Sequence, residues 1–444
     1  MLNRYLRTGV SVILCLAASK IVCAGQASFR IVSYMDKYDQ PAGLTEGSPG
    51  VFYGIAGVSS TAVAFSVTPQ GSKSVLASFP SGYNIGSLFV AASNDRLYSS
   101  VQLSDSPASV FSITSTPGKK DYPAQNLNPT LTQSLPGGEL LAVSTRLVKT
   151  VISYYLATVD LNGVVTAVTQ FPSNELDPGT AIYASDGNYY GISQATNGTT
   201  GYVFRVTPSG SLTKLYDFPS GTFVGYLQVP LLQADDGNLY GAAPVAGTNG
   251  TGIIFKLTLD GQYTLLYTFP KNNNGYPSSL IEGSDGNLYG ATIGNFSAGG
   301  VGQLFRITKS GQYTLLYEMS VPARDGACGC GLVLGSDGII YGTAQGSGRA
   351  GAGAIFALDA GLPKPRPWAK KFGPQSGPAG TRVRIWGANL LSATVQFNGV
   401  PAVAVSSSGP NYVWATVPAG ATTGPISVTT PGGSNTTQAS FTVQ

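Results

Sequence analysis

Short apolar runs alternate with turn residues along most of the chain, and this pattern predicts β-strands. Within residues 276–319 the runs are rich in aromatic and β-branched residues, which favour strand over helix. An Asp-Gly-Asn turn at 285–287 supplies the positive φ angles that a tight hairpin needs. The segment therefore predicts four strands, at 279–282, 288–292, 303–308 and 313–319.

The four-strand pattern recurs along the chain, at a spacing of about 40–50 residues. The second strand of each unit carries a tyrosine: Tyr53, Tyr98, Tyr190, Tyr240, Tyr289 and Tyr341. The third strand carries a phenylalanine: Phe65, Phe111, Phe204, Phe255, Phe305 and Phe356. A weaker copy between Tyr98 and Tyr190 has Leu140 to Val143 as its second strand and Tyr155 in place of the phenylalanine. The seven units predict an all-β fold, a seven-bladed β-propeller.

The two ends of the repeat region complement each other. The last unit ends after its third strand, at residues 355–358, and the chain then becomes rich in proline. Residues 29–34, followed by Pro41 to Leu44, align with a fourth strand and its continuation elsewhere in the repeat. We therefore expect the N-terminal strand to complete the last blade and close the ring, which protects strand edges from aggregation.

The composition changes near residue 360. All 21 acidic residues precede it, and only basic charges follow. We assign residues 25–361 to the propeller, 362–371 to a Pro/Lys/Arg-rich linker and 372–444 to a second domain, whose short alternating strands predict a small β-sandwich. The basic residues near the linker, Lys364, Arg366, Lys370 and Lys371, suit either an acidic polymer or membrane surface, or simple solvation of the linker.

Two families resemble these regions. The segments GSDGNLYG, G-x-x-F-x-(I/L/V)-T and G-x-Y-T-L-L-Y resemble the GloVer tandem repeat of exported bacterial proteins, over most of residues 28–359. The resemblance implies an exported propeller of undefined activity. The segments around Pro374, Val383, Val395 and Val417 resemble an IPT/TIG domain, an immunoglobulin-like module that implies a spacer or binding role.

Residues 1–24 resemble a secretory signal peptide. Arg4 and Arg7 precede an apolar stretch, and Val22-Cys23-Ala24 fits a cleavage site. We expect a secreted, periplasmic or cell-surface protein with no integral membrane span after cleavage, and an uncleaved anchor is the alternative. An exported protein is not expected to bind nucleic acid, and the second domain offers only Arg382 and Arg384 to phosphate.

The mature chain contains two cysteines, Cys328 and Cys330. In an oxidising compartment they could form a tight disulfide that pins the loop before the last blade, or remain two thiols in a glycine-rich turn. Two cysteines without histidine cannot supply the usual four zinc ligands. The sequence therefore predicts no metal site and no cofactor.

The chain contains no histidine, which excludes Ser-His-Asp and Cys-His catalysis and histidine-based proton transfer. A carboxylate pair of the glycosidase kind remains open. The repeated acidic residues lie in hairpin turns, where turn chemistry explains them: Asp186, Asp236, Asp285 and Asp337. No catalytic residue is therefore assigned.

Propeller topology separates the loops onto two faces. Turns between first and second strands, and between third and fourth strands, lie on one face, the turn face. The longer second-to-third loops and the connections between units lie on the opposite face, the variable face, where we expect a ligand to bind. Candidate ligand-binding residues in the connections are Tyr83, Asn84, Glu175, Asp177, Asn274, Tyr276, Arg324 and Asp325.

Three functions fit the sequence. The first is an exported non-catalytic binding or adhesion protein that presents a ligand face to an extracellular glycan or a cell-surface protein, with the TIG domain as a spacer. The second is a glycan-active hydrolase with a carboxylate pair at the propeller channel. The third is a structural component of an envelope or matrix. Low charge, the absence of histidine and strong repetition favour binding or structure over catalysis.

Overall fold

The computed structural model of the protein is all-β in the residues that it describes. These residues contain no helix, and therefore none that is long and apolar enough to cross a membrane. The described residues are 27–35, 41–57, 62–80, 83–85, 88–92, 94, 96–103, 109–123, 127–148, 151–172, 178–193, 201–219, 229–271, 274–294, 301–319, 328–345, 352–406 and 409–444.

Before residue 360 the described residues form seven antiparallel sheets, which we number 1 to 7. Strands are given from the first to the last of each sheet. Sheet 1 contains β2 (Pro41–Ser48), β3 (Val51–Ala56), β4 (Ala62–Val67) and β5 (Lys73–Phe79), and sheet 2 contains β6 (Tyr83–Ile85) with β7 (Val90–Ala91), β8 (Leu97–Leu103), β9 (Ser109–Ile113) and β10 (Lys119–Pro123). Sheet 3 contains β11 (Asn128–Ser134), β12 (Leu140–Val148), β13 (Val151–Val159) and β14 (Val165–Gln170), and sheet 4 contains β15 (Ala181–Tyr183), β16 (Tyr189–Ser193), β17 (Tyr202–Val206) and β18 (Leu212–Asp217).

Sheets 5 to 7 follow the same order. Sheet 5 contains β19 (Leu232–Gln233), β20 (Leu239–Ala243), β21 (Ile253–Leu257) and β22 (Tyr263–Thr268). Sheet 6 contains β23 (Pro277–Glu282), β24 (Leu288–Thr292), β25 (Gln303–Ile307) and β26 (Tyr313–Glu318). Sheet 7 contains β27 (Cys328–Leu334), β28 (Ile340–Gln345), β29 (Ala354–Asp359) and β1 (Ser28–Tyr34). First strands of neighbouring sheets contact one another, as in β7 with β11, β23 with β27 and β27 with β2, so they lie innermost in a propeller-like arrangement.

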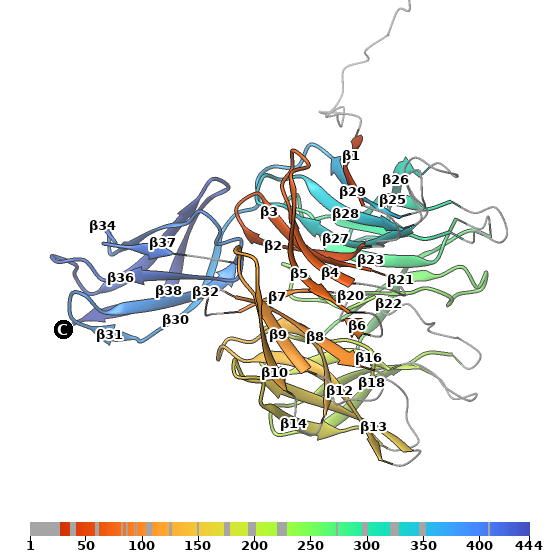
Figure 1. Ribbon diagram of the computed structural model, residues 1–444, viewed down its shortest axis with the longest axis horizontal. Coiled ribbons are helices and arrows are strands. Elements are labelled where there is room, and N and C mark those ends of the chain that lie inside the picture. Colours follow the sequence, from red (N-terminus) through yellow and green to blue (C-terminus); the bar gives the residue numbers. More distant parts are fainter. Residues whose placement is uncertain are drawn as a thin grey trace, which may run out of the picture.

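The N-terminal strand completes sheet 7. β1 pairs antiparallel with β29, from Ser28 opposite Asp359 to Tyr34 opposite Ala354, and the two strands lie side by side in Figure 1. This pairing confirms the expectation that the first strand of the chain is added to the last unit. β29 is consequently flanked by β28 on one side and β1 on the other.

A glycine follows five of the six repeated tyrosines and makes room for the repeated phenylalanine, whereas Ser99 follows Tyr98. A Cβ at Gly290 would lie 2.2 Å from the ring of Phe305, and one at Gly342 would lie 2.3 Å from the ring of Phe356. Both rings are fully buried. In the sheets that have this glycine, the Tyr-Gly and Phe repeat therefore encodes a packing unit in which a Cβ on the glycine would collide with the third-strand ring.

Stacked aromatic rings join neighbouring sheets at their outer strands. Tyr216 of sheet 4 stacks on Tyr263 of sheet 5 at 3.9 Å, and Tyr267 of sheet 5 stacks on Tyr313 of sheet 6 at 4.5 Å. Sheets 6 and 7 are joined in the same way, because Tyr317 of sheet 6 stacks on Phe29 of β1 in sheet 7. The two tyrosines of the Y-T-L-L-Y repeat thus serve the two junctions of their sheet.

The C-terminal domain is a sandwich of two sheets (blue in Figure 1). One contains β30 (Trp368–Gly373), β32 (Arg382–Ala388), β36 (Tyr412–Thr416) and β35 (Val405–Ser406), and the other contains β31 (Ser376–Gly377), β38 (Gly433–Val443), β37 (Gly424–Thr430), β33 (Thr394–Phe397) and β34 (Val400–Pro401). The expected linker of residues 362–371 is too long, because β30 begins at Trp368 and pairs with β32. The apolar alternation of β30 was hidden by the adjacent Lys370 and Lys371, at a register shift between the two strands.

Candidate functional site

The repeated aspartates lock the first hairpin of sheets 4 to 7. Asp337 accepts a hydrogen bond of 2.7 Å from the hydroxyl of Tyr341 and one of 3.0 Å from the backbone N–H of Ile339. The same bond joins Asp186 to Tyr190, Asp236 to Tyr240 and Asp285 to Tyr289. Burial of these side chains and their bonds to the aspartates raise the pKa of the tyrosines. The aspartates are structural, as their place in the turns predicts.

A second repeated contact joins one sheet to the turn of the preceding sheet. Gln233 of sheet 5 accepts the backbone N–H of Ser185 at 2.7 Å, and Glu282 of sheet 6 accepts that of Asp235 at 2.9 Å. Glu46 of sheet 1 holds the equivalent place and accepts the backbone N–H of Ser336, in sheet 7, at 2.8 Å. The side chain of Glu46 therefore bonds the first sheet to the last.

Glu46 is almost completely buried, with 4% of its surface exposed. It also accepts hydrogen bonds from the Ser336 hydroxyl at 2.7 Å and from the Gly50 backbone N–H at 2.8 Å. Burial raises the pKa of the Glu46 carboxyl, although these hydrogen bonds and that of the Ser336 N–H work in the opposite direction. Three donors thus surround one carboxylate at the ring junction.

Sheet 7 has Leu334 at the position of these acceptors, so it cannot make the equivalent bond to sheet 6. The chain after β29 takes its place: the Ser284 hydroxyl, in the turn of sheet 6, donates to the carbonyl of Pro363. The Asn389 side chain, in the C-terminal domain, donates to the carbonyl of Arg366 at 2.9 Å. The short connection is therefore bonded to both domains.

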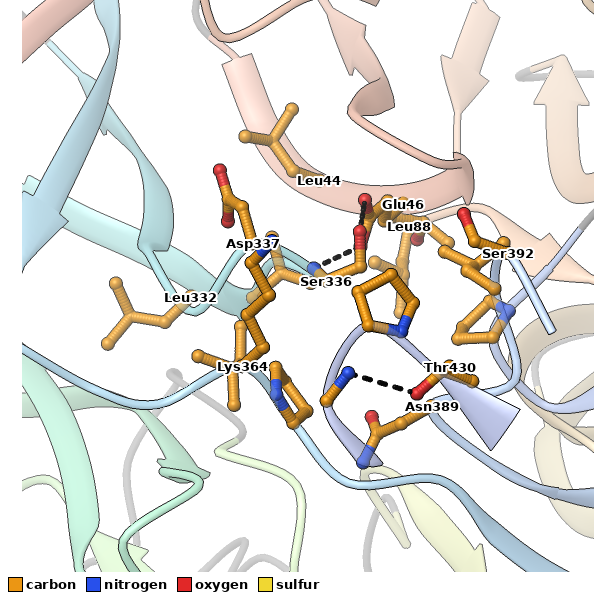
Figure 2. Close-up of a pocket in the computed structure, with 18 residues that line it drawn as sticks. Leu44, Glu46, Leu88, Leu332, Ser336, Asp337, Lys364, Asn389, Ser392 and Thr430 are labelled. Carbon is orange, nitrogen blue, oxygen red and sulfur yellow. Dashed lines mark hydrogen bonds between the residues drawn. The ribbon is translucent and has the colours of Figure 1, made fainter. Parts of the chain in front are cut away.

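A cavity of about 360 Å³ lies where the two domains meet (Figure 2). The propeller contributes strands β2 and β27 and the turn that follows β27, the connection contributes Lys364, and the C-terminal domain contributes loops next to β32, β36 and β37. Its polar lining includes Glu46, Ser336, Asp337 and Asn389, and leucines and prolines supply much of the rest. Because the lining includes the first-to-second-strand turn of sheet 7, the cavity opens on the turn face.

The two carboxylates of the cavity are Glu46 and Asp337, and both are engaged by groups of the protein itself. The Asp337 charge adds to the effect of burial in raising the Glu46 pKa. A carboxyl with a raised pKa can act as an acid, but a catalytic acid must direct its proton towards a substrate. The Glu46 oxygens instead accept bonds from Ser336 and Gly50.

An ion cluster bridges sheets 5 and 6 on the same face. Lys309 forms ion pairs with Asp235 and with Glu282, at 2.6 Å in the second case. The hydrogen bond from Lys309 lowers the pKa of Asp235. Burial raises the pKa of Glu282, since Lys309 offsets only part of the desolvation. The cluster fastens adjacent sheets, and among the residues that the structure describes no group of three or more potential ligands could hold a metal.

On the variable face, the structure describes two of the candidate residues in full. The Asn274 carbonyl accepts the Thr292 hydroxyl at 2.7 Å, and its side-chain oxygen accepts the Val301 N–H at 3.0 Å. Tyr276 has a positive φ of 63° and donates its N–H to the Thr251 carbonyl at 2.7 Å. Both residues hold the connection between sheets 5 and 6 against neighbouring loops, and they lie two positions apart in that connection.

The other candidates are only partly described. Tyr83 and Asn84 lie in β6, opposite Leu103 and Gln102, rather than in a connection. Cys328 and Cys330 lie in β27, where Cys328 is opposite Gln345, and their bonding state stays a prediction. Glu175, Asp177, Arg324 and Asp325 fall outside the described residues. The residues that line the cavity were not predicted, although the shared position of Glu46, Gln233 and Glu282 in the repeat was a usable signal.

Comparisons with family models match both regions. Residues 164–371 match the Gloeobacter/Verrucomicrobia repeat, and residues 367–443 match the IPT/TIG domain. The second match begins one residue before β30, in agreement with the shorter connection. No curated protein matches the chain significantly.

Solved structures share the fold at low sequence identity. A catalytically inactive virginiamycin B lyase of Staphylococcus aureus is 14% identical, with a TM-score of 0.53, and the match covers 75% of this chain and 99% of the lyase. The WD40 β-propeller domain of Doa1 is 11% identical, with a TM-score of 0.50 and coverage of 74% and 96%. A fungal alcohol oxidase in complex with copper is 12% identical, with a TM-score of 0.52, and covers 95% of this chain and 100% of the oxidase. These similarities establish a β-propeller fold.

Proposed function

We propose that this protein, which carries the Gloeobacter/Verrucomicrobia repeat followed by an IPT/TIG domain, is an exported, non-catalytic binding protein. In this proposal sheets 1 to 7 are the seven blades of one closed propeller. The variable face presents a binding surface to an extracellular glycan or a cell-surface protein. The TIG domain acts as a spacer or a second contact on the turn face.

One observation carries the proposal: the acidic side chains of the repeat are bonded within the fold. Asp186, Asp236, Asp285 and Asp337 accept hydrogen bonds from tyrosine hydroxyls, and Glu46 and Glu282 accept backbone N–H groups of the adjacent sheet. A rigid ring with loops of variable length is a scaffold suited to recognition. A propeller can bind a ligand through such loops without any catalytic group, because one fold supports different functions.

A second candidate is a glycan-active hydrolase. It is favoured by one observation, that Glu46 and Asp337 share a cavity and burial raises the pKa of Glu46. Two carboxylates in one cavity are the minimum for glycoside hydrolysis. Against it stand the three hydrogen bonds that fix Glu46 to the ring junction. The lyase and the oxidase of similar fold do not favour catalysis, because identities of 14% and 12% indicate fold alone.

The test exposes the purified protein to soluble and insoluble polysaccharides and to envelope fractions, and measures both retention and the release of shorter products. We expect retention without products. Asp177→Asn and Arg324→Ala should weaken retention if the variable face binds the ligand. Asp121→Asn is the control, because its exposed ion pair with Lys119 lies on an outer strand and contributes little.

The remaining outcomes separate the alternatives. Shorter products that disappear in Glu46→Gln, while that variant stays folded, would replace the binding proposal with the hydrolase. Neither retention nor products from any glycan or envelope fraction would leave a structural role in an envelope or matrix as the better account.

A further inference from the structure

All three tryptophans of the 444-residue chain lie in one sheet of the TIG domain. Trp368 lies in β30, Trp386 in β32 and Trp414 in β36. In β32 the buried Val383 and Ile385 alternate with Arg382, Arg384 and Trp386, which therefore point away from the sandwich core. The outer face of this sheet combines tryptophan and basic residues, and we call it the Trp–Arg face: Trp368, Lys370, Arg382, Arg384, Trp386 and Trp414.

The side chains of the Trp–Arg face are stacked in order. The Arg384 guanidinium lies 4.2 Å from the ring centre of Trp386 and 5.2 Å from that of Trp414. The Arg382 guanidinium lies 4.4 Å from the ring centre of Trp414, and the Lys370 amine lies 5.3 Å from that of Trp368. Cation–π contacts of this kind fix the planes of the guanidinium groups before any ligand arrives.

Stacking occupies the flat faces of a guanidinium and leaves the N–H donors at its edges. Those donors form a fork that fits a carboxylate or a sulfate. Arg382 and Lys370 are exposed, and Trp368 is 50% exposed. The face therefore offers oriented, accessible cationic donors beside aromatic rings.

The charge of this face is not balanced within its own domain. No acidic residue follows position 360 in the sequence. Partial burial and the neighbouring Lys371 lower the pKa of Lys370, with Asp186 of the propeller acting in the opposite direction. Burial also lowers the pKa of Arg384. A bound anion would offset both the repulsion between Lys370 and Lys371 and the cost of burying the Arg384 charge.

The arrangement is also costly for a purely structural surface. Arg384 Nε and Trp386 Nε1 are buried, and neither has a hydrogen-bond partner among the described residues. Buried donors of this kind are uncommon in native proteins. Hydrophobic or uncharged residues would cover the same sheet without that cost, so the pattern favours a binding role.

We infer that the Trp–Arg face binds an acidic polysaccharide, with the arginines and Lys370 bonded to its carboxylate or sulfate groups and tryptophan edges against the sugar rings. The inference rests on the proposed binding function. It specifies the class of ligand that the protein binds and makes the Trp–Arg face of the TIG domain the second contact surface. Charge complementarity selects a polyanion. Among polyanions, export favours a glycan over a nucleic acid.

The location of the tryptophans provides a direct assay, because the whole intrinsic tryptophan fluorescence of the protein arises from this face. The full-length protein is titrated with polygalacturonate, with dextran sulfate and with neutral dextran. We expect a saturable fluorescence change with one or both acidic polymers and none with dextran. The apparent affinity should fall as salt is raised from about 50 mM to about 300 mM, because exposed charges are screened. Comparison of the two acidic polymers distinguishes carboxylate from sulfate.

The Arg382→Ala/Lys370→Ala double variant should bind about tenfold more weakly, since it removes two charge-assisted contacts. The Lys364→Ala/Arg366→Ala double variant is the matched control, because it likewise removes two exposed positive charges, both from the connection. Arg382→Lys keeps the charge but loses the planar fork, and it should lie between the wild type and the double variant. Far-ultraviolet circular dichroism and the melting temperature check that each variant is folded.

Several outcomes would overturn the inference. One is an equal loss of affinity in Lys364→Ala/Arg366→Ala, which would indicate diffuse attraction. Another is the absence of any response to either acidic polymer, or an equal response to neutral dextran. A third is a response to a DNA oligomer but to no acidic glycan. If the protein is still retained on a neutral glycan or an envelope protein, the proposed function stands while this inference fails; release of shorter products would instead refute the proposed function.

Discussion

Phe29 provides the sharpest test of how the ring is closed. Its ring stacks on Tyr317 of sheet 6 at 4.0 Å with an angle of 6° between planes, and lies 5.4 Å from Phe356 of β29. The side chain is mostly buried, so Phe29→Ala removes roughly 120 Å² of apolar contact, about 3 kcal/mol at about 25 cal/mol per Å². The stacked pair adds about 1 kcal/mol beyond its area.

We therefore expect Phe29→Ala to lower the free energy of unfolding by about 4 kcal/mol, measured by urea denaturation. A double-mutant cycle with Tyr317→Ala should give a coupling energy of about 1 kcal/mol. Leu265→Ala is the control, because that side chain is 51% exposed on the outer strand of sheet 5. A loss no larger than that of Leu265→Ala, or a coupling energy near zero, would refute the proposed role of β1 in joining sheets 6 and 7.

Three further predictions concern the repeat and the ring junction. Tyr341→Phe removes the 2.7 Å bond to Asp337 and should cost about 1–2 kcal/mol in unfolding free energy by urea denaturation. Gly290→Ala places a Cβ 2.2 Å from the Phe305 ring and should cost about 1–3 kcal/mol or prevent folding, as seen by the melting temperature and soluble yield. Glu46→Gln should become less stable relative to the wild type as the pH falls from about 7 towards about 4.5. Burial raises the pKa of Glu46 in the folded state, so the folded wild type takes up a proton more readily than the unfolded chain, and acidification stabilises it while the variant gains nothing.

Two of these predictions have a matched control variant. Tyr53→Phe should change little, since sheet 1 has Pro49 where sheets 4 to 7 have an aspartate. Gly137→Ala should also change little, because a Cβ there meets no atom within 4 Å. For Glu46→Gln, unfolding curves at about pH 7.5, 5.5 and 4.5 that differ from the wild type by a constant amount would contradict the assigned burial of the charge.

The repeat pattern predicted the architecture because it records local geometry. The Asp-Gly turns, the Tyr-Gly pair and the third-strand phenylalanine each follow from contacts within one sheet, as at Asp285, Gly290 and Phe305. The pairing of β1 with β29 was predictable for the same reason, since residues 29–34 carry the pattern of an outer strand. The family comparisons confirm the repeat and the TIG domain.

The junction between the domains was not predictable in this way. The expected binding surface was the variable face, whereas the cavity lies on the turn face, because the chain leaves sheet 7 at the end of its third strand and the C-terminal domain packs there. The connection to that domain is held by single contacts, such as that of Ser284 with Pro363, in which one partner lies outside the four-strand unit. The charge of Lys370 and Lys371 likewise concealed a strand that lies against the core through Ala369 and Phe372.

The placement of β29 has a mechanical consequence for a protein that holds a ligand through its C-terminal domain. A pull on that domain acts on the chain directly after β29, which is hydrogen-bonded along both edges, to β28 and to β1. Such a load runs parallel to the strand, so both ladders must shear together before the strand leaves the ring. The terminal strand that completes sheet 7 therefore also anchors the TIG domain against force, and a chain tethered by its C-terminal domain would resist extension until β29 separates from both β28 and β1.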